Sequence, residues 1–184
     1  YPGNRGSCIM SNKAAQLKTV LVDDNILVRG SGALIDGVAV RKAKVFPDER
    51  GRLGEIMRRD DPWFEQFGQV YFTTTYPGVV KAWHYHEKQT DHFCVIKGTV
   101  KIGLCDNRKD SPTYKVVNEL YLGEHTPGVV KIPPGVQHGW MCVSDCEAYI
   151  INMVSEMYNY SQPDEYRTDA HENDIAYEWK RKDG

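Results

Sequence analysis

The sequence predicts an all-β protein, a barrel or a sandwich, on three observations. Short runs rich in β-branched and aromatic residues alternate with turn signals from Gly37 onward. The turns carry Pro and Gly, as in Pro77-Gly78 and Pro127-Gly128, and helical patterns are scarce. Many short strands separated by turns at regular spacing are typical of a sandwich or a barrel.

The expected strands follow one another along most of the chain. Their ranges are 38–46, 69–75, 79–85, 92–96, 99–104, 116–122, 129–132, 139–143 and 148–154. Segments 60–66 and 164–170 are expected to form short helical turns. In the first, Asp61 would be the N-cap and Pro62 the first helical residue, which is a helix start signal. We therefore expect a barrel with a few short helices.

The chain has 184 residues, which fits one domain with a sizeable core. Residues 1–9 carry no initiator Met and read as a segment foreign to the natural protein, which would begin at Met10. Residues 10–36 would form an N-terminal arm or an extra strand. Residues 37–184 would form the barrel domain.

Charge and composition exclude several kinds of partner. Lys and Arg number 23 and Asp and Glu number 25, a formal net charge of −2, and no basic block argues for nucleic acid. No apolar run reaches the roughly 20 residues that span a bilayer, and no signal peptide is visible, so we expect no membrane partner. The five cysteines lack CxxC spacing, which favours a reduced, cytoplasmic protein.

A histidine pair marks the strand at 79–86. Strand alternation places His84 and His86 on one face. Gly78 lies six residues before His84, Asp91 lies five after His86, and Gly98 lies seven after Asp91. This spacing resembles the first motif of the cupins, with Asp91 where that superfamily usually has Glu.

The second cupin motif, P-x-G-x-x-H, is present as Pro133, Gly135 and His138. The joint resemblance implies a cupin double-stranded β-helix, a jelly-roll barrel. Three imidazoles and one carboxylate that converge in such a barrel can hold a divalent metal ion. A histidine there can equally act as a general base without any metal. The set in question is His84, His86, Asp91 and His138.

A closer resemblance covers the chain from about Gly37 to Trp179. Seven segments are similar, in the same order, to the dTDP-4-dehydrorhamnose 3,5-epimerase family. They are 44–51 followed by Glu55, 67–70, 81–85, 106–114, 132–140, 156–158 and 173–179. The resemblance implies an isomerase that epimerises carbons beside the 4-keto group of a dTDP-6-deoxyhexose, in dTDP-rhamnose biosynthesis.

The resemblance also assigns roles to residues. His84 would be the base and Tyr158 the opposing acid. The family's substrate-contact positions are occupied here by Arg50, Glu55, Gln69 and His138, with Lys81 in place of an Arg. Arg50 would pair with the diphosphate of a nucleotide-diphosphate sugar. On pattern alone, Arg50 is an ordinary turn arginine and Tyr158 a packing residue.

Two departures from the family lie beside the base. Asp91 stands roughly where the family has a Lys that stabilises the enolate, and His86 stands where it usually has Gln. Asp91 would either orient His84 as a catalytic partner or bind a metal together with His84, His86 and His138. Because the family works without metal, we expect no cofactor, with a divalent metal as the alternative.

Three other functions fit the same motifs. A sugar 3,4-ketoisomerase shares the H-x-H strand and the enolisation step. A metal-dependent cupin of another reaction type would use the four-ligand set. A non-catalytic sugar-binding cupin would explain the lost Lys. Cupins of this type commonly exchange strands between subunits, so we expect a homodimer to which residues 10–35 contribute an arm.

Overall fold

A computed structural model describes residues 14–23 and 26–181, and these form fourteen strands and no helix. The strands are β1 (Lys18–Asp23), β2 (Ile26–Gly30), β3 (Ala39–Lys42), β4 (Lys44–Asp48), β5 (Gly51–Glu55), β6 (Gln69–Thr75), β7 (Val80–Tyr85), β8 (Asp91–Lys97), β9 (Thr99–Asp106), β10 (Val117–Gly123), β11 (Gly128–Ile132), β12 (Val136–Cys142), β13 (Ala148–Val154) and β14 (Tyr166–Arg167).

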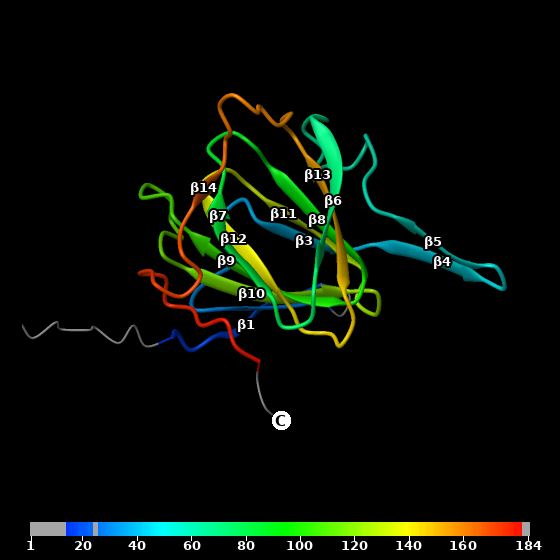
Figure 1. Cartoon of the computed structure of the whole chain (residues 1–184), viewed down its shortest axis with the longest axis horizontal. Coiled ribbons are helices and arrows are strands. Elements are labelled where there is room, and N and C mark those ends of the chain that lie inside the picture. The colour runs from blue at the N-terminus through cyan, green and yellow to red at the C-terminus, as the bar shows by residue number, and fades with distance from the viewer. Residues whose placement is uncertain (1–13, 24–25, 182–184) are drawn as a thin grey trace, which may run out of the picture.

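Two antiparallel sheets build the barrel. The larger sheet has the order β1-β2-β10-β9-β12-β7-β14, and the smaller has the order β3-β11-β8-β13-β6. Figure 1 shows the two sheets facing each other, with the β4–β5 hairpin projecting to one side. Along the chain from β8 to β13, strands β8, β11 and β13 lie in the smaller sheet and β9, β10 and β12 in the larger, so the chain crosses repeatedly between the sheets, as in a jelly roll. The all-β cupin fold expected from the sequence is confirmed.

The main core fills the space between the sheets. Alternate residues of β2 and β13 are buried, and Ile26, Val28, Leu104, Leu120 and Ile150 are at most 1% exposed. Burial of such side chains contributes about 1.5–3 kcal/mol each. The core thus fixes which face of every strand points inward, including the strands that carry histidines.

A second cluster lies on the outer face of the larger sheet, beneath the C-terminal segment. The Trp83 and Trp179 rings lie 4.9 Å apart between centroids, and Ile175 packs with them. Gly103 on β9 lies beneath both rings, and a Cβ there would come within 2.9 Å of Trp179 and 3.0 Å of Trp83. The chain end therefore belongs to the same packed unit as the barrel.

The loop after β9 is fastened by one buried carboxylate. Asp106 is 0% exposed and accepts hydrogen bonds from the Arg108 guanidinium, Ser111 Oγ and Thr113 Oγ1. Burial alone would raise the pKa of Asp106, but these donors hold it well below its usual value. Part of the stability of this loop therefore depends on the ionised form of Asp106.

The N-terminal region supplies extra strands. β1 pairs with β2, and β2 pairs with β10, so the region extends the larger sheet by two strands. Residues 1–9, expected to be foreign, lie outside the described residues, as do residues 10–13 and 24–25 of the arm.

The short helices expected at 60–66 and 164–170 are wrong. Within the described chain both segments are turns, bends and extended structure. Asp61 binds Arg41 and the Arg58 N–H, while the Asp164 carboxylate accepts N–H groups from a different loop. Asp61, the expected N-cap, therefore binds donors that precede the turn it was expected to cap. The described residues also contain no helix long and apolar enough to cross a membrane.

Candidate active site

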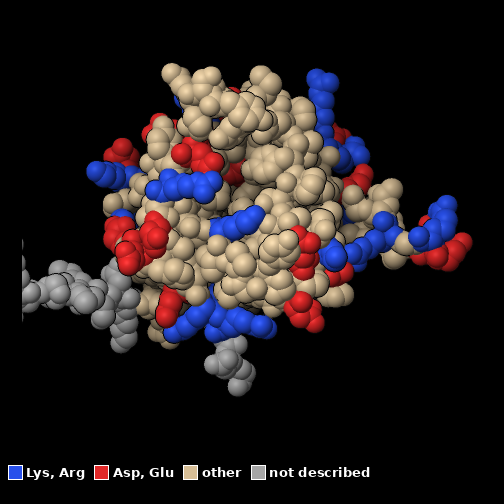
Figure 2. All heavy atoms as spheres, viewed as in Figure 1, with Lys and Arg blue, Asp and Glu red and all other residues tan. Residues whose placement is uncertain are grey.

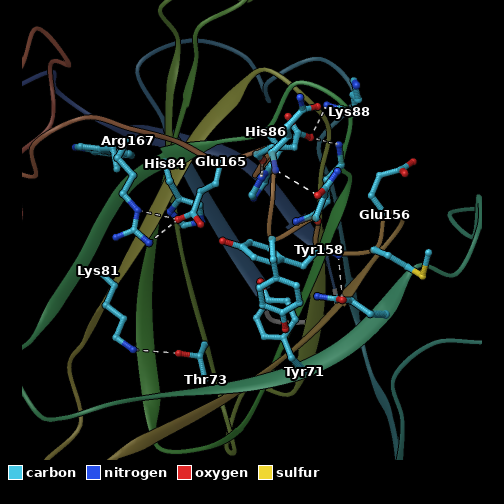
Figure 3. A pocket seen from close by; sticks show the side chains of 18 of the residues that line it. Tyr71, Thr73, Lys81, His84, His86, Lys88, Glu156, Tyr158, Glu165 and Arg167 are labelled. Atoms are coloured by element: carbon cyan, nitrogen blue, oxygen red, sulfur yellow. Dashed lines mark hydrogen bonds and ion pairs between the residues drawn. The ribbon is translucent and has the colours of Figure 1, made fainter.

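The main cavity lies in the barrel, between the larger sheet and the edge of the smaller one. Its volume is about 920 Å³, and residues of β6, β7 and β12 line it together with segment 156–167. Figure 3 shows its side chains. Charges of both signs are interspersed on the face seen in Figure 2, with no large patch of either sign.

Four side chains with metal-binding chemistry meet at this cavity. His84 lies on β7 and His86 directly follows it, while Asp91 opens β8 and His138 lies on β12. β7 and β12 pair with His138 opposite His84, so neighbouring strands bring the two motifs together. One donor atom from each of the four residues lies within 4.8 Å of the others.

The orientation of His86 and His138 is fixed by backbone carbonyls. His138 Nδ1 lies 2.9 Å from the Val136 carbonyl, and His86 Nδ1 contacts the Asp164 carbonyl. A carbonyl only accepts, so both Nδ1 atoms carry hydrogen, and each Nε2 atom presents a lone pair when its ring is neutral. Those Nε2 atoms lie 3.3 Å (His86) and 3.0 Å (His138) from Asp91 Oδ2.

The convergence of Asp91 Oδ2 with the Nε2 atoms of His86 and His138 requires a positive charge. Asp91 Oδ2 and His138 Nε2 are buried and have no well-directed hydrogen bond within the described residues. Burial alone would raise the pKa of Asp91, but its contacts with His138 and His86 hold that pKa well below its usual value. For His86, burial opposes protonation, and the Asp91 carboxylate outweighs it and raises the pKa. A shared proton or a cation would occupy the space between the three atoms.

The geometry also fits a metal ion. Two ligand atoms bound at about 2.1 Å, with angles between 90° and 110°, lie roughly 3.0–3.4 Å apart. The separations of Asp91 Oδ2 from the His86 and His138 nitrogens match this range. Two histidines and one carboxylate form the arrangement used by several open metal sites. The residues therefore fit a divalent metal, with His84 at the edge of the group.

His84 is placed on the cavity wall beside this group. Its ring centroid lies 4.1 Å from that of His138. Burial, and next the neighbouring His138, hold the pKa of His84 well below its usual value. A neutral imidazole has a lone pair that can accept a proton. No ion pair joins Asp91 to His84 among the described residues; its carboxylate contacts are with His86 and His138 instead.

Tyrosines form another wall of the cavity. Tyr158 and Tyr71 both line it, and Figure 3 shows them on the side away from His84 and Arg167. The Tyr158 backbone N–H donates to Gln69 Oε1 at 3.1 Å, which ties the segment to β6. Burial raises the pKa of Tyr71 to about 12, so its hydroxyl keeps its proton at neutral pH.

The remaining expected site residues divide into two groups. Lys81 lines the cavity, where its Nζ donates to Thr73 Oγ1 at 3.0 Å and to the Thr74 carbonyl at 2.6 Å. Arg50 and Glu55 instead lie on the projecting hairpin and do not line the cavity. The Arg50 side chain is 83% exposed and pairs with Asp48 at 2.5 Å. Within one chain, the structure does not bring Arg50 or Glu55 to His84.

Several lining residues were not expected from the sequence. Arg167 lies opposite His84 because β14 pairs with β7, and its guanidinium binds Glu165 at 2.6 Å. Tyr71 lies on β6, and Asn152 on β13 stands behind it. A two-residue strand formed by pairing across the chain leaves no signal in a single sequence, and Arg167 lay in segment 164–170, which we expected to form a helical turn.

Comparison with known proteins agrees with the geometry. SpsL, a spore coat polysaccharide biosynthesis protein of Bacillus subtilis, is 39% identical over 79% of this chain and 97% of its own. Agl13 of Haloferax volcanii, named a probable low-salt glycan biosynthesis epimerase, is 41% identical over 72% of this chain and 86% of its own. The crystal structure of a dTDP sugar isomerase from Desulfovibrio desulfuricans has a TM-score of 0.74 at 28% identity, covering 79% of this chain and 92% of that one.

The fold and the site therefore define a cupin enzyme of the sugar epimerase and isomerase class. The resemblance to dTDP-4-dehydrorhamnose 3,5-epimerases found in the sequence is confirmed. The profile described as the polysaccharide biosynthesis C-terminal domain matches residues 46–166, and the chain belongs to that family.

Proposed function

We propose that this enzyme epimerises a 4-keto-6-deoxy nucleotide-sugar, of the dTDP-4-dehydrorhamnose type, for the synthesis of a surface polysaccharide or glycan. The observation that carries the proposal is the cavity with His84 on one side and tyrosine hydroxyls on another. The names of SpsL and Agl13 support the glycan context.

The proposed chemistry follows from the placement of His84 on one wall of the cavity and Tyr158 on another. A hydrogen on the carbon beside the ketone is acidic, because its removal gives an enolate whose charge lies on the ketone oxygen. An imidazole nitrogen of His84 takes this proton from one face of the ring. The Tyr158 hydroxyl returns a proton from the other face, which inverts the carbon. Lys81 also lines the cavity and supplies a positive charge there.

We further propose that His86, Asp91 and His138 hold a divalent metal ion. The support is the buried set of two imidazole nitrogens and one carboxylate oxygen, at ligand-to-ligand spacing. When bound, the ion supplies the positive charge beside the enolate that a Lys supplies in the resembled family. His84 lies beside this group and remains the base.

We propose that the enzyme is a homodimer in which the hairpin reaches the partner. Phe46 and Leu53 on the hairpin are 56% and 61% exposed, and Figure 1 shows the hairpin standing clear of the barrel. Such apolar surface is expected to be covered. This arrangement would carry Arg50 to the diphosphate in a second copy's cavity. We propose a cytoplasmic location, supported by the four cysteines in the described part of the chain, all of which are free.

Solvent exchange tests the reaction. The purified protein is incubated with dTDP-4-keto-6-deoxyglucose in heavy water, and deuterium is located by NMR and mass spectrometry. Deuterium at carbon 3, carbon 5 or both, lost in His84→Ala, is expected. His125→Ala is the matched control, since His125 is exposed in a loop. Absence of exchange with the wild-type protein excludes this activity.

A 3,4-ketoisomerase is the second candidate, favoured by the H-x-H strand and by the likeness to the dTDP sugar isomerase from Desulfovibrio desulfuricans. It uses the same enolisation, but the carbonyl moves from carbon 4 to carbon 3. The same NMR experiment separates the two, because the carbonyl carbon of the product has a different coupling pattern in each case.

A further inference from the structure

Asn152 is a buried amide on β13 whose three hydrogen bonds fix its orientation. It is 1% exposed. Its Oδ1 accepts the His92 backbone N–H at 3.1 Å, so the other end of the amide must be the NH2 group. That group donates one hydrogen to Asp91 Oδ1 at 2.9 Å and the other to Tyr71 Oη at 2.8 Å.

This orientation decides the direction of the Tyr71 hydroxyl. Tyr71 Oη accepts from Asn152, so its own hydrogen must point away from the amide. No acceptor among the described residues takes that hydrogen, and Tyr71 lines the cavity. The hydroxyl therefore offers a donor to whatever the cavity holds.

The position of this donor relative to the reacting groups is also fixed. Asn152 bridges Tyr71 and Asp91, and the other oxygen of Asp91 faces His86 and His138. A second amide, Gln89 Nε2, donates to Asp91 Oδ1 at 2.8 Å, so the carboxylate cannot turn. The Tyr71 hydroxyl thus stands one amide away from the buried charge cluster.

We propose that Tyr71 donates a hydrogen bond to the ketone oxygen of the bound sugar, and that Asn152 is the positioning residue that aims it. This rests on the proposed function, since it assumes a ketone in the cavity. Negative charge develops on that oxygen when His84 removes the proton, so a fixed donor stabilises the enolate more than the ketone. Tyr71 is then a catalytic residue distinct from Tyr158.

Removal of the hydroxyl tests the proposal by binding and by exchange. Affinities of dTDP-4-keto-6-deoxyglucose and of dTDP alone are measured by calorimetry for wild type and Tyr71→Phe. We expect the keto-sugar to bind about 3- to 10-fold more weakly to the variant and dTDP to bind equally. Deuterium exchange should fall about 100-fold. Tyr76→Phe, at a 68% exposed tyrosine just beyond β6, is the control.

A double-mutant cycle tests the positioning role. Asn152→Leu should weaken keto-sugar binding more in the wild-type background than in the Tyr71→Phe background, because the part of its effect that acts through Tyr71 is absent from the second. A merely structural role, or one exerted through Asp91 alone, would weaken binding equally in both backgrounds, which would remove Asn152 from the proposal.

The affinity measurements also separate this proposal from the proposed function. A wild-type protein that binds the keto-sugar more tightly than dTDP, with an advantage that Tyr71→Phe abolishes, supports the donor even if no deuterium enters. Equal keto-sugar affinity in wild type and Tyr71→Phe overturns it, as does a wild type that binds the keto-sugar no better than dTDP. Exchange by the wild type that survives in Tyr71→Phe leaves the epimerase standing and overturns the donor.

Discussion

Gly139 on β12 controls the approach of the two strands that carry the histidines, and its substitution by Ala is expected to be severe. An added Cβ would press first on Ala82 Cβ, and it would also come within 2.7 Å of two backbone atoms of β7, the Lys81 carbonyl oxygen and Ala82 Cα. Ordinary contact between such atoms begins near 3.5 Å, so the strands must separate by almost 1 Å. Both atoms belong to backbone, which cannot swing aside as a side chain does.

The cost should exceed that of ordinary overpacking, so we expect about 3 kcal/mol or more of lost unfolding free energy. For a domain of this size, this corresponds to a melting temperature lowered by roughly 6–12 °C. Calorimetry and urea titration measure both quantities. Gly54→Ala on β5 is the matched control, because its nearest contact would be an ordinary 3.9 Å from Val45. A Gly139→Ala protein as stable as that control would refute the assigned role of the close strand contact.

Three further predictions concern the metal, the loop and the hairpin. The purified protein should bind about one equivalent of a divalent metal with release of protons, so its metal affinity should rise with pH, and calorimetry in two buffers measures this. His86→Ala should lower the metal affinity at least about 100-fold, while His125→Ala should leave it unchanged. Asp106→Asn should lower the free energy of unfolding by about 2–3 kcal/mol in urea titrations at pH 7. Since the folded-state pKa of Asp106 is depressed, this stabilisation is present above the unfolded pKa and is lost as the pH falls through the folded pKa. A stability difference between wild type and variant that stays constant down to about pH 2 contradicts this prediction. Arg50→Ala should change the melting temperature by no more than about 1 °C, because an exposed ion pair contributes little to stability. In a dimer verified by light scattering, it should weaken dTDP binding about 10-fold. Unchanged dTDP affinity argues against delivery of Arg50 to the cavity of a partner subunit.

The histidine cluster was predictable because its determinants are local. Strand alternation places His84 and His86 together, and two motifs of fixed spacing add Asp91 and His138. The ranges 69–75 and 148–154 coincide with β6 and β13 for the same reason, since alternation and flanking turns are visible in a short window.

The rest of the site depends on long-range pairing. Arg167 lines the cavity only because β14 adds to β7, and Asn152 meets Tyr71 because β13 pairs with β6. The expected helices failed for a related reason, since Asp164 binds the N–H groups of Glu87, Lys88 and Gln89 rather than those of its own segment. A lone sequence does not reveal which distant donors a carboxylate will meet.

The charge cluster joins the two sheets at the cavity end of the barrel. His138 belongs to the larger sheet, His86 directly follows β7 of that sheet, and Asp91 belongs to the smaller sheet, so a metal ion there would be a crosslink as well as a Lewis acid. At a free concentration a hundredfold above its dissociation constant, such an ion would add about 2.7 kcal/mol to the stability of the folded state. If the proposed ion is bound, metal starvation would lower the stability of the folded state by that amount, in addition to removing the charge beside the enolate.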